Sequence, residues 1–158
     1  MNGNMYEVAL NEAWELFGSH LHGARSALVC VLSELPLDER SQRALNSSTE
    51  ALGYGKAACT FATLRDAAEP GSNQDILDDQ ALFLMLEGLD PLCLVCADAA
   101  AAAACARAYR CEVPAGKPCR VFGRTAVAFA SFPAMLDDGQ DKQVAWALLK
   151  KLPKFGER

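Results

Sequence analysis

Apolar and polar positions alternate along the chain in blocks that predict strands followed by helices. The clearest block is residues 89–110, where an apolar run at 92–96 is followed at once by Asp98 and then by an alanine-rich run with Arg107 and Arg110 near its end. A short continuous apolar run is typical of a strand buried in a parallel sheet, and an aspartate often caps the start of a helix. The pattern therefore predicts a central buried strand that leads directly into a helix.

The rest of the chain shows the same alternation of predicted strands and helices. Continuous apolar runs predict further strands, and apolar residues three or four positions apart predict helices. The predicted strands are residues 27–32, 57–64 and 125–131, the last preceded at 120–124 by a second short strand or a hairpin arm. The other predicted helices are Met5–Phe17, 38–52, 76–88 and 140–152. Glycine and proline predict loops at 18–23, which holds His20 and His22, and at 65–75, whose Asp75 would cap the third of these helices.

Strands alternating with helices predict a three-layer α/β domain with a mostly parallel sheet of about four strands and right-handed crossovers. We expect one domain over residues 1–158, with an N-terminal helix and loop at 1–24 and a basic tail at 153–158. Sheets of this kind bind ligands beyond the carboxyl ends of their strands. Here those ends are residues 33–36, the loop from Arg65, 97–98 and 131–133. A binding site is therefore expected at this edge of the sheet.

Composition favours a globular protein over a disordered or membrane-spanning one. Apolar residues make up 51% of the 158 positions, yet no apolar stretch approaches the ~20 uninterrupted residues of a membrane span. The first residues carry acids and lack the basic start of a secretory signal. We therefore expect a soluble, cytoplasmic protein with no membrane partner.

Seven cysteines raise the question of a metal site or of disulfides. Cys93 and Cys96 form a CxxC pair, but residues three apart on a strand point to opposite faces of the sheet. The others are scattered among apolar neighbours, where a thiol packs as a small hydrophobic group. An odd count without a secretory signal fits reduced thiols. Neither a metal site nor a cofactor is predicted.

The net charge of −5 is unevenly distributed. Residues 1–105 hold 5 basic and 15 acidic residues, a net charge of −10, whereas residues 106–158 hold 10 basic and 5 acidic residues, a net charge of +5. A basic C-terminal third is compatible with an anionic partner such as a nucleic acid. The more common explanation is a solvated helix face and a polar tail, and both interpretations stay open.

Three segments, in order along the chain, resemble motifs of the uracil-DNA glycosylase superfamily, particularly its thermophile-type branch. The family's first strand ends in G-E-A-P-G followed by acidic residues, and residues 33–39 read SELPLDE. Its third strand reads P-x-V-I-V-A-L-G-x-x-A-A, and residues 91–100 read PLCLVCADAA. Its last motif, P-T-Y-H-P-S-x-L before a helix with K-x-x-x-W-x-D-L, is similar to ASFPAML at 130–136 and KQVAWALLKK at 142–151. The resemblance spans roughly residues 27–152 and implies the superfamily's fold.

The residues that carry this family's chemistry are largely replaced. Its final motif supplies a histidine that stabilises the uracil anion, and the matching position is Phe132. Its second strand ends near an asparagine that reads the flipped base, where this chain has Thr63, a donor of one hydrogen bond. Ser33 and Leu37 replace glycines that let the backbone approach the nucleotide. The four cysteines of the branch's iron–sulfur cluster have no match, so no cluster is expected.

These departures favour a non-catalytic domain that acts as a binding or adaptor module with a protein partner. A similar use of this fold without activity is known for the psi subunit of the bacterial replicative polymerase, a small protein-interaction subunit. In this interpretation Glu34 and Asp38 cap the following helix and favour its positive end.

The enzymatic alternative is a DNA base-excision glycosylase with an altered active site. Glu34 or Asp38 would orient the attacking water, and Phe132 would stack on or wedge beside the extruded base. The phosphate contacts would come from three basic residues of the C-terminal third, Lys117, Arg120 and Arg124.

A third interpretation is a generic α/β domain that binds a small ligand at its strand ends. The chain has no G-x-G-x-x-G or G-x-x-x-x-G-K-[ST] run, which removes the usual dinucleotide and nucleoside-triphosphate versions. The ligand-contacting residues predicted at this edge are Ser33, Pro36, Thr63, Asp98 and Phe132.

Overall fold

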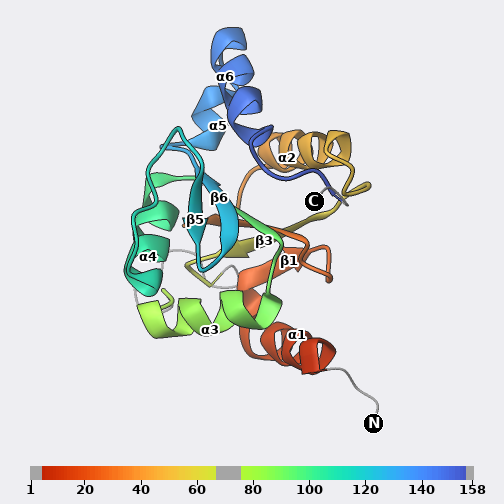
Figure 1. The fold of residues 1–158 in the computed structure, drawn as a ribbon, viewed down its shortest axis with the longest axis vertical. Coiled ribbons are helices and arrows are strands. Elements are labelled where there is room, and N and C mark those ends of the chain that lie inside the picture. Colours follow the sequence, from red (N-terminus) through yellow and green to blue (C-terminus); the bar gives the residue numbers. More distant parts are fainter. Residues whose placement is uncertain (1–4, 67–75, 156–158) are drawn as a thin grey trace.

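A mixed sheet of six strands forms the centre of the part of the chain that the computed structural model describes, residues 5–66 and 76–155 (Figure 1). The strand order is β1-β3-β2-β4-β6-β5. The strands are β1 (Leu21–Gly23), β2 (Val29–Ser33), β3 (Cys59–Thr63), β4 (Cys93–Cys96), β5 (Cys119–Val121) and β6 (Arg124–Ala128).

The four central strands, β3, β2, β4 and β6, run parallel. Every residue of β2, β3 and β4 is buried, because helices cover both faces of the sheet there, and this explains their continuous apolar sequences. The register places Val29 beside Cys59 on one side and beside Cys93 on the other. The carboxyl ends of these strands therefore meet at one edge of the sheet.

The prediction of about four strands was too low, because a short antiparallel strand is added at each edge. β1 pairs antiparallel with β3, so residues 21–23 form a strand where the glycines predict a loop. β5 pairs antiparallel with β6 through a turn at Phe122 and Gly123, so residues 119–128 form two short strands. A strand of three residues has too short a pattern to be recognised, and its pairing partner decides whether it forms.

Six α-helices and one 3₁₀ turn accompany these strands within the described residues. They are α1 (Met5–Phe17), the 3₁₀ turn η1 (Gly18–His20), α2 (Glu39–Ala51), α3 (Asp79–Leu89), α4 (Ala99–Tyr109), α5 (Phe132–Met135) and α6 (Gly139–Leu149). The residue that directly precedes each of the helices α2 to α6 caps it. Its side chain accepts a hydrogen bond from a backbone N–H of the first turn, which has no partner within the helix itself. These caps are Asp38, Asp78, Asp98, Ser131 and Asp138.

Three helices differ from the sequence-based expectation. α6 ends at Leu149 rather than at residue 152. α3 begins at Asp79 after the cap Asp78, rather than at residue 76, and the predicted cap Asp75 lies outside the described residues, as does most of the predicted loop at 65–75. α5 is a single turn of four residues that no periodic pattern predicts.

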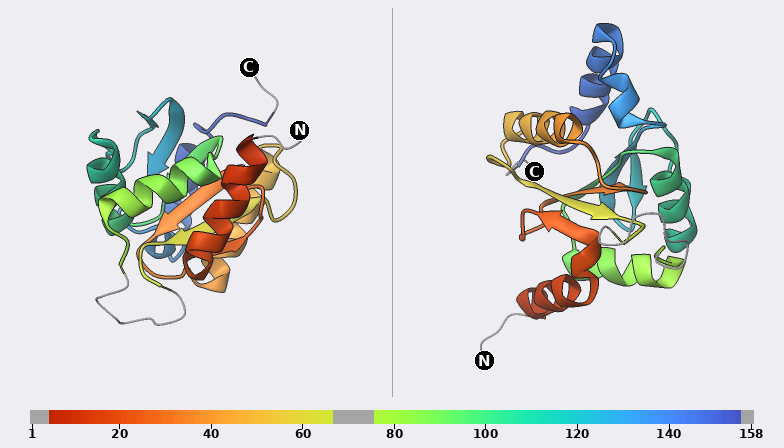
Figure 2. Two further views of the ribbon diagram at one scale, coloured as in Figure 1. Left: turned by 90° about the horizontal axis from the view of Figure 1, so that it is seen from below. Right: turned by 180° about the vertical axis from the view of Figure 1, so that it is seen from behind.

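The helices cover the sheet in two layers (Figure 2). α1, α3 and α4 pack on one face, and α2, α5 and α6 pack on the other. Cys96 belongs to the first of these cores and Cys93 to the second, so the two cysteines of the CxxC pair point to opposite faces as predicted. The fold is therefore α/β, with helices on both faces of the sheet. In the described ranges no helix is both long and apolar enough to cross a membrane.

Candidate functional site

Beyond the carboxyl ends of two neighbouring strands, β2 and β4, the chain turns to opposite faces of the sheet, and a crevice lies between the two connections. After β2 it passes to α2 on one face, and after the adjacent β4 it passes to α4 on the other. Ligands of open α/β sheets bind at switch points of this kind. A cavity of about 300 Å³ lies at the two strand ends and is lined by Glu34, Leu35, Pro36, Leu37, Asp38, Asp98 and Pro133. The structure thus brings together four of the predicted site residues, namely Glu34, Pro36, Asp38 and Asp98.

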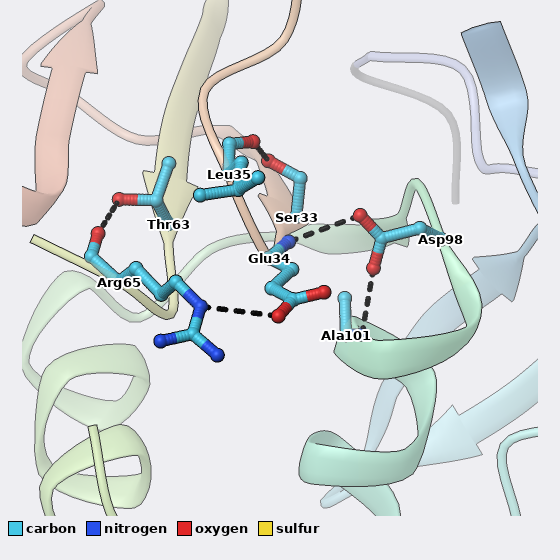
Figure 3. A network of polar contacts seen from close by, with 7 residues as sticks. All are labelled: Ser33, Glu34, Leu35, Thr63, Arg65, Asp98 and Ala101. Carbon is cyan, nitrogen blue, oxygen red and sulfur yellow. Dashed lines mark hydrogen bonds and ion pairs between the residues drawn. The ribbon is translucent and has the colours of Figure 1, made fainter. Parts of the chain in front are cut away.

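Asp98 ties the two strand ends together (Figure 3). Its Oδ2 accepts a hydrogen bond from the backbone N–H of Glu34 at 3.0 Å. Its Oδ1 accepts the N–H of Ala101 at 2.8 Å and so caps α4. Both carboxylate oxygens are therefore held by backbone donors, one from the loop after β2 and one from the helix after β4. Asp98 fixes the shape of the crevice.

Glu34 does not cap α2; it forms an ion pair with Arg65 (Figure 3). Arg65 Nε lies 3.1 Å from Glu34 Oε2, and the two side chains are 20% and 37% exposed. The backbone N–H of Arg65 also donates to the carbonyl oxygen of Glu34 at 3.1 Å. The pair therefore reinforces the link between the ends of β2 and β3. The sequence places Arg65 at a strand end where a site is expected, but it gives this side chain no specific role.

Ser33 and Thr63, the last residues of β2 and β3, are buried and donate their hydroxyl protons to their own loops (Figure 3). Ser33 Oγ donates to the carbonyl oxygen of Leu35 at 2.7 Å, and Thr63 Oγ1 donates to that of Arg65 at 2.6 Å. Hydrogen bonds from a hydroxyl to the backbone two residues ahead shape a turn. Each side chain's single donor is therefore used by the fold and not offered to a ligand.

Asp38 lines the crevice while it caps α2. Its Oδ1 accepts the backbone N–H of Ser41 at 3.0 Å. Ser41, whose backbone N–H donates to this carboxylate, lowers the pKa of Asp38, and the charge of Arg40 acts in the same direction, so the carboxylate is ionised at neutral pH. The cap thus places a stable negative charge in the same crevice as Glu34 and Asp98.

The structure places Phe132 in the core and not in the crevice. Phe132 is the first residue of α5, it is 1% exposed, and its ring packs edge-on against Phe129 with 5.1 Å between ring centroids. Its backbone N–H donates to the carbonyl oxygen of Ala97 at 2.8 Å, which anchors the start of α5 beside the end of β4. The helical turn then directs the ring into the core formed with α2 and α6. Its neighbour Pro133 lines the crevice instead.

Arg120 and Arg124 lie on the β5–β6 hairpin, at the opposite end of the sheet from the crevice. Arg124 pairs with Glu87 and Asp90, each at 2.9 Å, and its side chain is only 9% exposed. Arg120 donates to a backbone carbonyl of the hairpin turn at 3.0 Å. The exposed Lys117 lines a second cavity, next to α6. The three basic residues predicted to contact phosphate are therefore not brought together at the crevice.

A buried histidine lies close to the same edge of the sheet. His20 directly precedes β1, and its Nδ1 is 2.9 Å from the carbonyl oxygen of Thr63. Because β1 runs antiparallel to β3, the residue before β1 meets the carboxyl end of β3. The glycines around His20 predict a loop, and without the pairing of β1 no local signal in the sequence points to this histidine.

No group of three or more histidine, cysteine or acidic side chains within the described residues is arranged to hold a metal ion. All seven cysteines are free. Burial raises the pKa of Cys30 to about 12 and that of Cys93 to about 11, so these thiols are protonated at neutral pH. They act as packing groups, as free buried cysteines usually do.

The crevice is acidic, and its acids are held by hydrogen bonds. Glu34, Asp38 and Asp98 line it, and no basic side chain of the described chain is part of the lining. Arg65 pairs with Glu34, and the charge of Arg40, which donates to the carbonyl oxygen of Pro133 at 3.1 Å, acts on Asp38.

No protein-family model and no curated protein matches the chain.

Proposed function

We propose that the protein is a non-catalytic binding or adaptor module built on a uracil-DNA glycosylase-like domain. The observation that carries the proposal is that each candidate carboxylate already serves the fold. Asp98 joins two strand ends, Glu34 pairs with Arg65, and Asp38 caps α2. A general base has to be directed at the proton it removes. These carboxylates are instead directed at backbone donors and at an arginine of their own chain.

The position that corresponds to the family's histidine supports the same proposal. Phe132 is buried and has no polar group with which to stabilise a departing base anion. Thr63, at the position of the base-reading asparagine, donates its proton to its own turn. A domain with these replacements retains a scaffold and loses the groups that carry out excision.

The charge of the crevice favours a protein partner over DNA. Three carboxylates line the crevice, and a phosphate backbone approaching them is repelled. Arg120 and Arg124, which would offset this repulsion, lie at the far end of the sheet, and Arg124 is already paired with two acids. A partner segment with basic or amide groups complements this surface.

A cytoplasmic location is part of the proposal. All seven cysteines are free, and five of them are buried. Free buried thiols are typical of proteins in a reducing compartment.

The test combines an excision assay with DNA binding. The purified protein is incubated with single- and double-stranded oligonucleotides that contain uracil, hypoxanthine or only ordinary bases, over a range of salt concentrations. We expect no abasic sites and no salt-dependent binding. Saturable excision that is lost in Glu34→Gln or Asp38→Asn, but kept in the exposed control Asp141→Asn, would replace the proposal with that of an altered glycosylase.

A further inference from the structure

A second cavity lies beside α5, at the carboxyl end of β6. Pro133 of α5 lines the crevice, whereas Met135 of the same helix lines this cavity, so the single turn of α5 stands between the two. The volume of the cavity is about 540 Å³, within the ~300–1,000 Å³ typical of small-molecule sites. Its walls are the loop at residues 115–118 and one face of α6, and its lining is mostly apolar.

Backbone contacts hold the loop wall of this cavity in place. The N–H of Gly116 donates to the carbonyl oxygen of Ala128 at 2.9 Å, and Ala115 forms a bridge with the same residue. Gly116 has a φ of +89°, a left-handed conformation that glycine adopts without strain. Because the loop is anchored to β6, the cavity is built into the fold.

The opposite wall is a face of α6 that the core does not use. Ala145 and Leu149 are buried against the sheet, whereas Val144 and Ala147 are exposed and line the cavity together with Leu148. Val144 is 54% exposed. A ligand that covers this face removes apolar surface from water, which is favourable.

Two lysines supply the charge of the cavity. Lys117 comes from the loop and Lys151 from the end of α6, and both are exposed. Across residues 5–66 and 76–155 neither lysine takes part in a salt bridge, whereas five arginines are paired with acids. No acidic residue of the described chain lines the cavity. The cavity therefore combines a mostly apolar lining with two lysine charges that form no salt bridge within the described residues.

We propose that this cavity binds an amphipathic carboxylate, a small apolar alkyl or aryl group with one carboxylate at its end. The chain packs on Phe129, Met135 and Leu148, and the carboxylate pairs with Lys117 and Lys151. This inference goes beyond the proposed function. It concerns another cavity and a small molecule, and it does not depend on the family resemblance.

Octanoate is the probe, and octan-1-ol and octylamine are matched probes with the same chain and a neutral or positive head group. In ¹H–¹⁵N spectra of the full chain, octanoate is expected to shift the amide signals of residues 115–117 and 144–151 in a saturable way. The amide signals of Glu34, Leu35, Leu37 and Asp38 in the crevice should stay in place. Octan-1-ol should bind about tenfold more weakly and octylamine not measurably, because neither forms the ion pairs. Equal affinities for octanoate and octan-1-ol would overturn the carboxylate assignment, and shifts centred on the crevice, or none, would overturn the site.

Substitutions in the lining locate the binding independently. Ala147→Trp fills the cavity from an exposed position and should abolish octanoate binding. Lys117→Gln combined with Lys151→Gln should weaken octanoate binding about tenfold and leave octan-1-ol binding unchanged. Lys142→Gln, an exposed position of α6 outside the lining, is the matched control and should keep wild-type affinity. Octanoate binding that survives Ala147→Trp, or that falls as far in Lys142→Gln as in the double variant, contradicts the proposal.

Discussion

The crevice between β2 and β4 and the cavity beside α6 lie at the same end of the sheet, yet they differ in polarity and in charge. The crevice is acidic, and Asp98, Glu34 and Asp38 are held there by hydrogen bonds or an ion pair. The cavity is larger and mostly apolar, and its two lysines have no ion-pair partner among the described residues. Bound strand ends and helix caps explain the polar groups of the first region.

The two regions thus separate polar groups that are already bonded within the fold from surface that is open to a ligand. Residues 34–38 supply most of the crevice lining, and their polar groups there join strands and begin a helix. Open apolar surface and unpaired charge, which a ligand can use, occur instead around α6. Four measurements of stability test this difference between the two regions.

The largest effect is expected at Phe132, the buried ring at the start of the turn between the two regions. Phe132→Ala should lower the free energy of unfolding by about 3–5 kcal/mol, because it empties a position that is 1% exposed. Urea unfolding followed by circular dichroism measures the loss, and Phe132→Leu covers the case in which the alanine variant does not fold. Phe155→Ala, at a ring that is 51% exposed, is the control and should cost about 1 kcal/mol or less. Equal costs would mean that Phe132 is not a core residue.

The next effect is expected at Asp98, which has two structural functions where an ordinary cap has one. Asp98→Ala should lower the free energy of unfolding by about 2–3 kcal/mol. It removes both the cap of α4 and the hydrogen bond that the backbone N–H of Glu34 donates to the Asp98 carboxylate. Asp138→Ala, which removes only the cap of α6, should cost about 1 kcal/mol in the same unfolding assay. If the two variants lose the same stability, Asp98 does not tie the strand ends together.

Asp38 should give a smaller effect that depends on pH. Its pKa is lower in the folded protein, so its stabilising contribution is present above the unfolded pKa near 3.8 and is lost as the pH falls through the folded pKa. The difference in unfolding free energy between wild type and Asp38→Ala should be about 1 kcal/mol at pH 7 and should shrink below about pH 4. Glu39→Gln, in the same helical turn but without a capping bond, is the control. A difference that stays constant down to pH 2 would contradict the assignment of the cap.

The smallest effect is expected for the ion pair of Glu34 and Arg65. A double-mutant cycle with Glu34→Gln and Arg65→Gln should give a coupling energy of about 0.5–1 kcal/mol, because both side chains are partly exposed. The more exposed pair of Glu39 and Arg43, at 3.5 Å, is the matched comparison and should give about 0.3–0.5 kcal/mol. Zero coupling for Glu34 and Arg65 would leave the Glu34 carboxylate free for another role and weaken the contrast between the regions.

Elements with a strong pattern of their own can be predicted from this sequence. The helix predicted at Met5–Phe17 agrees with α1, and the apolar runs predict the parallel strands β2, β3 and β4. Asp38 and Asp98 cap helices because an aspartate before a helical pattern is itself a local signal. Since both follow parallel strands, their meeting at one edge can also be expected from the sequence.

The rest of the site depends on contacts between distant segments. Arg65 meets Glu34 only because β3 lies beside β2, and His20 reaches Thr63 only because residues 21–23 add a strand to β3. A loop and a strand of three residues carry no local pattern for such a partner.

Local sequence is enough to predict the alternation of buried strands and helices, the caps of α2 and α4, and the opposite orientation of Cys93 and Cys96, because these follow from propensities and periods within about ten residues. Only the tertiary structure decided that Phe132 points into the core, that the polar side chains of the crevice hold its strand ends, and that a cavity opens beside α6. These features depend on which surfaces remain uncovered once all elements have packed. That outcome depends on long-range contacts, which no single stretch of the chain contains.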